Sequence, residues 1–298
     1  MLDIHVKVTG SLIKVLFVSV ITLFVLFASC KKDPPQPPVN NNPRDTTYVS
    51  ATIQNPDPKV VLVEEFTGIY CYTCPLAHYI VADIIKDNPS RIAAANIHSR
   101  HYGIYSNPNV MGNLYDFRTY DADSIVTFLG GVFSVPSGAV DRKIFTGETG
   151  IISKNRALWE SYVDEQLTQQ VPVNIKISDS YDTNSRKLQI VVELNYVLNV
   201  TENNYLTVEL VENDIVDKQY VDTAVVDDYE HQHILRKILT EFEGDFINTT
   251  LEPGRVYIRV FEYVLPAEWN NDNLEVIAFV HEKDDKWNVL QSGFKSLQ

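Results

Sequence analysis

Hydrophobic residues in the first half of the chain follow strand and helix patterns in turn. Residues 59–66 (KVVLVEEF) form a short, valine-rich run that is typical of a buried strand. The segment PLAHYIVADIIKDN places Leu76, Ile80 and Ile84 four residues apart, and its initial proline is favoured in the first turn of a helix. Residues 153–170 repeat the helical spacing, which predicts a helix that closes the first domain.

After Pro172 the pattern changes to the strict alternation of half-buried strands. Six such segments are separated by Asn, Asp, Gly and Pro turns: VNIKISDSY, KLQIVVELNYVL, YLTVELVEN, RVYIRVFEYVL, LEVIAFVHE and KWNVLQSGF. A series of this kind predicts an antiparallel β-sandwich over residues 172–298. On these strands, Glu209 and Arg259 are expected to belong to the solvated half of the alternation.

The N-terminus has the layout of a bacterial lipoprotein signal over residues 1–29. A run of 15 apolar residues follows Lys7 and Lys14, and the sequence LFASC resembles a lipobox, after which Cys30 would be lipidated. At about 1.5 Å per residue this run is shorter than the roughly 30 Å hydrocarbon core, which disfavours a spanning helix. Plain secretion and an uncleaved anchor remain the alternatives.

The segment that follows is predicted to be a tether. Residues 31–48 contain five prolines and three consecutive asparagines, with almost no apolar residue to bury. We therefore expect a flexible tether over residues 30–50, a first domain over 51–171 and a second over 172–298. Lys31 stands where an aspartate would retain an enterobacterial lipoprotein in the inner membrane, so the outer membrane is expected, with either face possible.

Composition narrows the class of protein. The 298 residues are 45% hydrophobic and include 16 Tyr and 13 Phe, so wholesale disorder is excluded. The formal net charge of −14 repels phosphate backbones, so nucleic acid is not an expected partner. No nucleotide fingerprint or phosphate loop occurs, and no cofactor is expected.

One motif carries chemistry. Cys71 and Cys74 form a CxxC motif between the predicted strand and helix, which is the arrangement of a thioredoxin-like redox centre. The start of a helix offers unpaired N–H groups and a partial positive charge that lower the pKa of a thiol. The alternatives are an inert structural disulfide and a metal site, but a closed zinc site needs four ligands and only His78, His98 and His101 could supplement the thiols.

Two further residues agree with a redox centre. Glu65 precedes Cys71 by six residues, where thioredoxins carry a buried carboxylate, although it could also be a solvated residue at the strand end. Pro136 ends the segment GVFSVP, which resembles the thioredoxin segment with a cis-proline, and an ordinary trans proline is the alternative.

Residues 100–128 would then be an insertion that could form a wall of the redox site. His231 and His233 fit a polar loop better than a metal pair.

The strings EEFTGIYCYTCPLAH, DFRTY, VPSGAVDR, DYEHQHILRK and LEVIAFVHE resemble the outer-membrane-protein-28-related lipoprotein family of Bacteroides-type bacteria. The resemblance covers the mature chain and implies a thioredoxin-like α/β domain followed by an immunoglobulin-like, all-β domain at the outer membrane. It implies no settled activity.

Two functions are consistent with these features. In the first, a lipid-anchored outer-membrane protein exchanges thiols and disulfides with extracytoplasmic proteins. Cys71 would attack as a thiolate, Cys74 would resolve the mixed disulfide, Pro136 would shape the groove and Glu65 would relay a proton. In the second, the protein is a non-catalytic surface lipoprotein that binds a protein, a glycan or an envelope component, and the CxxC motif is a structural disulfide. No metal is assigned to either function.

Overall fold

The structure is a computed structural model that describes residues 44–131, 134–283 and 287–297. These residues belong to one compact unit. The predicted signal at residues 1–29, Cys30 and most of the tether lie outside the described residues. Within the described ranges, no helix combines the length and apolar character needed to cross a membrane.

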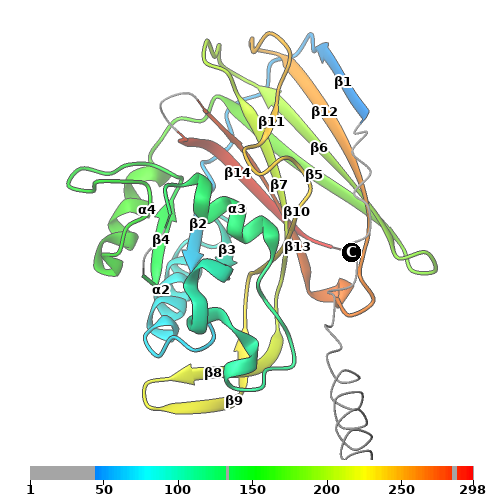
Figure 1. Ribbon diagram of the computed structural model, residues 1–298. Helices are drawn as coiled ribbons and strands as arrows, with labels where there is room; N and C mark the ends of the chain where they lie inside the picture. Colours follow the sequence, from blue (N-terminus) through cyan, green and yellow to red (C-terminus); the bar gives the residue numbers. More distant parts are fainter. Residues whose placement is uncertain (1–43, 132–133, 284–286, 298) are drawn as a thin grey trace, which may run out of the picture. The chain divides into compact units, whose positions relative to one another are not determined.

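The fold combines α-helices with several β-sheets (Figure 1). The helices are α2 (Cys74–Asp87), α3 (Tyr120–Phe128), α4 (Trp159–Leu167) and the 3-10 turns η2 (Arg100–Ser106), η3 (Pro108–Val110), η4 (Arg156–Leu158) and η5 (Asn271–Asn273). The strands are β1 (Arg44–Val49), β2 (Val61–Phe66), β3 (Ile92–Ile97), β4 (Ser137–Val140), β5 (Val173–Asp182), β6 (Lys187–Tyr196), β7 (Tyr205–Glu212), β8 (Ile215–Val221), β9 (Ala224–His231), β10 (Ile234–Ile238), β11 (Asp245–Phe246), β12 (Arg255–Val264), β13 (Leu274–His281) and β14 (Val289–Ser296).

The longest sheet has strands from both halves of the chain, in the order β14-β13-β7-β10-β3-β2-β4, with β11 added beside β7. In it, β2 pairs parallel to β3 and antiparallel to β4. The two halves meet where Ile234 of β10 pairs in parallel with Asn96 of β3. The sheet therefore continues across the predicted boundary at residues 171 and 172, and β5 begins immediately after it.

The alternation of side chains in β2 and β3 explains how this part of the sheet is covered. One set of positions, which includes Val61 and Val63 of β2, packs against α2 and α4. The other set, which includes Leu62 and Phe66, packs against α3 and against Ile277 of β13. Both faces of the sheet are thus buried, which suits the nearly continuous apolar sequence of the first predicted strand.

A separate sheet of order β1-β12-β6-β5 forms the other layer of the second half. Its inward-facing residues share one core with those of β7 and β13. The six strands predicted after Pro172 are all present as β5, β6, β7, β12, β13 and β14. Residues Arg44–Val49 differ from the expected tether, because they pair with β12 as strand β1 and Asp45 accepts hydrogen bonds from Arg259.

Two residues expected in solvent are buried. Arg259 is 8% exposed because Asp45 and Asp245 both pair with its guanidinium. Glu209 is fully buried beside Arg142. Alternation alone could not predict this, because an ion pair allows a charged residue to occupy an inward-facing position.

Candidate functional site

The CxxC motif lies where strand β2 gives way to helix α2. Cys71 follows the short loop after β2, and Cys74 is the first residue of α2, as the sequence predicts. The two cysteines form a disulfide. Both are buried, with Cys71 2% and Cys74 0% exposed. In the oxidised protein, neither sulfur is therefore open to a second protein.

A hairpin from the second half of the chain is bonded along the CxxC loop. This hairpin consists of β8 and β9 and lies beside the start of α2 (Figure 1). The side-chain amide of Gln219 donates to the carbonyl oxygens of Gly68 and Cys71, both at 3.3 Å. The backbone N–H of Tyr220 donates to the carbonyl oxygen of Ile69 at 2.8 Å. The hairpin is thus hydrogen-bonded to the carbonyl oxygens of Cys71 and of the residues just before it.

The rings and the tip of the hairpin extend this contact. The Tyr220 ring packs against the Tyr70 ring, with 5.0 Å between their centroids. At the tip, the N–H of Asp222 donates to the carbonyl oxygen of Tyr72. Asp222 has a φ of 53°, which suits a tight two-residue turn between β8 and β9. The hairpin therefore contacts the backbone of the loop from Gly68 to Tyr72, while the Tyr72 side chain stays 56% exposed.

The predicted insertion at residues 100–128 also contacts the CxxC loop. The N–H of Tyr70 donates to the carbonyl oxygen of Tyr105 at 2.8 Å. A Cβ atom on Gly68 would lie 2.5 Å from that same oxygen, so the close approach requires glycine here. The insertion contains the turns η2 and η3 and helix α3.

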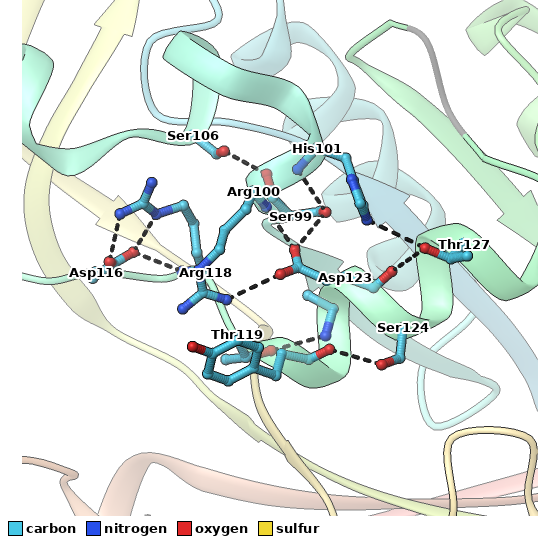
Figure 2. Close-up of polar contacts among 12 residues, drawn as sticks. Ser99, Arg100, His101, Ser106, Asp116, Arg118, Thr119, Asp123, Ser124 and Thr127 are labelled. Atoms are coloured by element: carbon cyan, nitrogen blue, oxygen red, sulfur yellow. Dashed lines mark hydrogen bonds and ion pairs between the residues drawn. The ribbon is translucent and has the colours of Figure 1, made fainter. Parts of the chain in front are cut away.

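Asp123 of α3 fixes the start of this insertion (Figure 2). Its carboxylate accepts hydrogen bonds from the Ser99 hydroxyl and the Arg100 backbone N–H, both at 2.7 Å, and from the Arg100 guanidinium at 3.1 Å. The His101 ring contacts Thr127 of the same helix at 3.2 Å. His101 therefore belongs to a local polar network.

Pro136 lies at the start of β4, next to the end of β2. The Val135–Pro136 peptide bond is cis, which is the geometry that the sequence predicts. Ser137 pairs with Phe66, the last residue of β2, so Pro136 is brought to the strand end from which the CxxC loop departs. The guanidinium of Arg156 donates to the carbonyl oxygen of Thr73, between the two cysteines, at 3.0 Å.

Glu65 is fully buried on the side of β2 that faces α2. Burial raises the pKa of its carboxyl group well above the usual range, and a hydrogen bond from Thr67 opposes this shift. The carboxylate lies 3.3 Å from Nε2 of His78, whose Nδ1 is 2.7 Å from the Tyr229 hydroxyl. The alternative that Glu65 is solvated at the strand end is thus excluded. Its carboxyl group instead contacts His78 of α2.

The remaining histidines lie apart from the disulfide in different surroundings. His98 is 1% exposed and packs edge-on against Phe117. His231 ends β9 and is 2% exposed, so the polar loop expected there is a strand end with a buried ring. Among the described residues, no three His, Cys, Asp or Glu side chains are placed to hold a metal ion together.

Sequence reasoning missed Gln219, Tyr220 and Tyr229 as site residues. They are 148 or more residues from Cys71, and no short pattern marks their contacts with the CxxC loop or with His78. The available signal was the two-residue turn at residues 222–223 between two valine-containing segments, which indicates a hairpin but not its position.

Fold and site together define a mixed α/β protein of several sheets with a buried CxxC disulfide at the start of a helix. The chain belongs to the family described as outer membrane protein Omp28, whose model matches residues 129–296. This confirms the resemblance found in the sequence and associates the protein with the outer membrane. The matched range includes the β8–β9 hairpin but begins after the CxxC motif.

Two solved structures share the fold. HBP35 of Porphyromonas gingivalis aligns with a TM-score of 0.62 at 19% identity, over 80% of this chain and 76% of that chain. A protein of Agrobacterium tumefaciens solved by the Northeast Structural Genomics Consortium aligns with a TM-score of 0.50 at 10% identity, over 80% of this chain and 95% of that chain. No curated protein matches the chain in sequence.

Proposed function

We propose that this chain is a lipid-anchored outer-membrane protein that acts by binding, and that its Cys71–Cys74 disulfide is structural. In this proposal Cys30 carries the lipid, residues 51–171 form a thioredoxin-like domain and residues 172–298 form an immunoglobulin-like sandwich. The order of strand, CxxC, helix and cis-proline supports the first assignment, and the two-layered β core supports the second.

One observation carries the choice of binding over catalysis. Both sulfurs are buried, and the β8–β9 hairpin is bonded to the loop that surrounds Cys71. Disulfide exchange needs in-line attack by an external thiolate on an exposed sulfur. In this protein the chain's own hairpin lies along the CxxC loop, so attack requires the hairpin to open.

Thiol–disulfide exchange is the second candidate, and specific observations favour it. Cys74 begins α2, where the helix terminus favours a thiolate. Pro136 is brought near the CxxC loop in the cis form, and Glu65 is buried on the adjacent strand. In this alternative Cys71 attacks, Cys74 resolves, Pro136 shapes the groove and Glu65 accepts a proton.

The reduction potential and mixed-disulfide trapping distinguish the two functions. We expect the potential of Cys71–Cys74 to lie below about −300 mV, in the range of inert structural disulfides. We also expect Cys74→Ser, which leaves Cys71 as a lone thiol, to trap no envelope protein. A potential near about −200 mV, or a trapped mixed disulfide that Cys71→Ser abolishes, would support exchange instead.

Removing the disulfide should cost a modest amount of stability. The bridge closes a loop of only about four residues, for which chain entropy gives roughly 2 kcal/mol. Cys71→Ala/Cys74→Ala should therefore lower the free energy of unfolding by about 2 kcal/mol, measured by urea denaturation of the mature chain. Wild type under reducing conditions is the matched control, and an unchanged free energy of unfolding would contradict a structural role.

Opening the hairpin should expose the disulfide. Gln219→Ala removes the hydrogen bonds to Gly68 and Cys71, and Tyr220→Ala removes the ring packed on Tyr70. We expect each variant to be reduced by dithiothreitol at least about tenfold faster than wild type, which corresponds to about 1.4 kcal/mol of easier opening. Val225→Ala, at an exposed position of the same hairpin, serves as the control. Equal rates in all four proteins would show that the hairpin does not protect the disulfide.

A further inference from the structure

A cavity of about 160 Å³ lies between helix α2, strand β3 and the end of strand β9. Its lining includes Glu65 of β2, His78 of α2, Asn96 of β3 and residues 229–233 at the end of β9 and just after it. Of the lining residues, the thiol chemistry considered above uses only Glu65. An engineered apolar cavity of about 150 Å³ accommodates benzene, so the volume is that of a small molecule.

Several buried polar atoms around this cavity lack a partner. The Oδ1 atom of Asn96, Nε2 of His231 and Nδ1 of His233 have no hydrogen-bond partner among the described residues. A buried polar group left without a partner costs about 1–3 kcal/mol, so native proteins rarely leave several together. Their concentration at one cavity indicates a ligand that supplies the missing hydrogen bonds.

The contacts of two of these residues show which partner they need. The side-chain N–H of Asn96 donates to the carbonyl oxygen of Gln232 at 2.8 Å, so Oδ1 is the acceptor that remains. Nε2 of His231 has no partner, and this ring nitrogen can accept or donate according to the tautomer. Asn96 therefore calls for a ligand that donates, and a hydroxyl group can serve both residues.

The buried histidines of the cavity are uncharged at neutral pH. Burial lowers the pKa of His78 to about 3 and the pKa values of His231 and His233 to about 4. They therefore offer no positive charge to an anionic ligand, and the side chain of Glu230 also lines the cavity. A neutral ligand with hydroxyl groups suits this lining, because a hydroxyl donates to Oδ1 of Asn96 and can donate to or accept from an unpaired ring nitrogen.

The remaining wall is apolar and partly aromatic. The rings of Tyr79 and Tyr229 line the cavity together with Val81 and Ala82. Tyr79 is 57% exposed and Ala82 is also exposed, so these two residues lie at its mouth. A sugar ring combines the two properties required here, since its C–H face packs on an aromatic ring while its hydroxyl groups donate at the edge.

We propose that this cavity binds one neutral sugar residue, either as a free monosaccharide or as the end of a glycan. The inference rests on the proposed binding function and names its ligand class. The sugar would enter past Tyr79, with its hydroxyl groups directed to Asn96 and His231.

Calorimetry and saturation-transfer NMR on the mature chain test this proposal. The probes are the methyl glycosides of glucose, galactose, mannose, fucose and N-acetylglucosamine, with glucosamine and N-acetylneuraminic acid as charged controls. Ala82→Trp should block the mouth and weaken binding of the best neutral probe at least tenfold. Asp83→Trp, at the neighbouring exposed position of α2 outside the cavity, should bind like wild type.

Tyr79→Ala removes the aromatic wall at an exposed position, so it should weaken the same probe without unfolding the protein. Tyr120→Ala, which is also exposed but lies outside the cavity, is its control. A sugar oligomer that binds more tightly than its methyl monosaccharide would identify a glycan end as the source.

Three outcomes would overturn the proposal. The first is that no neutral probe binds with a Kd below about 10 mM. The second is equal affinity in Ala82→Trp and wild type, which places the sugar elsewhere. The third is stoichiometric binding of Zn²⁺ or Ni²⁺ that His231→Phe abolishes while all sugars fail. A trapped mixed disulfide instead refutes the proposed function, so the two failures can be told apart.

Discussion

Replacing Arg142 with methionine is expected to destabilise the protein by about 3–5 kcal/mol, because the buried carboxylate of Glu64 loses its cation. The guanidinium of Arg142 donates to both oxygens of Glu64 at 2.8 and 2.6 Å, and it lies 3.9 Å from Glu209. All three side chains are 0% exposed. Glu64 belongs to β2 and Glu209 to β7, so one cation serves strands from both halves of the chain.

The electrostatics of this triad explain why the loss should be large. Burial and the charge of Glu64 raise the pKa of Glu209, whereas Arg142 lowers it. Without Arg142, the Glu64 carboxylate would be left without a cation in a water-free environment or would have to take up a proton. The melting temperature should fall by about 10 °C, given the usual 2–4 °C per kcal/mol for a protein of this size.

A neighbouring ion pair provides the matched control. Lys143 pairs with Glu165 at 2.7 Å, but their side chains are 31% and 51% exposed. Lys143→Met should therefore cost less than about 1 kcal/mol. The triple variant with methionine at residues 64, 142 and 209 should recover most of the lost stability, since no member of the triad is left as an unpaired buried charge. Equal losses for Arg142→Met and Lys143→Met would refute this account of the triad.

The elements near the CxxC motif could be predicted from the sequence because their determinants are local. The strand, the cysteine spacing and the helix that begins at Cys74 all lie within 29 residues, from Lys59 to Asp87. The apolar periodicity of α2 and the valine run of β2 each identify one element without help from the rest of the chain. Pro136 added a long-range prediction only because a Val-Pro pair before a strand is a recognisable pattern.

The surroundings of the motif could not be predicted, for a physical reason. The strands of the β8–β9 hairpin mix apolar and polar residues, with polar residues such as Asp217 and Gln219 at buried positions. Asp217 is buried because it accepts hydrogen bonds from backbone N–H groups of Leu114 and Tyr115. Such contacts depend on tertiary structure rather than on a repeating pattern, so the six strands predicted after Pro172 did not include this hairpin.

Glu275→Gln is expected to stabilise the protein at alkaline pH. Glu275 lies near the start of β13, is 8% exposed, and pairs across the sheet with Val211 and Ser296. Burial raises the pKa of its carboxyl group from 4.5 to about 7. The folded state therefore holds this proton more tightly than the unfolded state, and ionisation of Glu275 opposes folding.

The sign and size of the effect follow from these two pKa values. Below pH 4.5 the group is protonated in both states and contributes no penalty. As the pH rises, the penalty grows and is nearly complete above pH 7, where a difference of 2.5 pKa units corresponds to about 3 kcal/mol. Glutamine has the same shape without the charge, so the variant should be more stable than wild type by about 3 kcal/mol at pH 8 and by about 1 kcal/mol at pH 5.

Urea denaturation of both proteins at pH 5 and pH 8 measures this difference directly. Glu160→Gln, at an exposed position of α4, is the control and should change the free energy of unfolding by less than about 0.5 kcal/mol at either pH. A gain for Glu275→Gln of the same size at both pH values would mean that the amide improves packing or hydrogen bonding. In that case the buried charge of Glu275 would not be the source of the instability, because only a charge effect must vanish once the carboxyl is protonated.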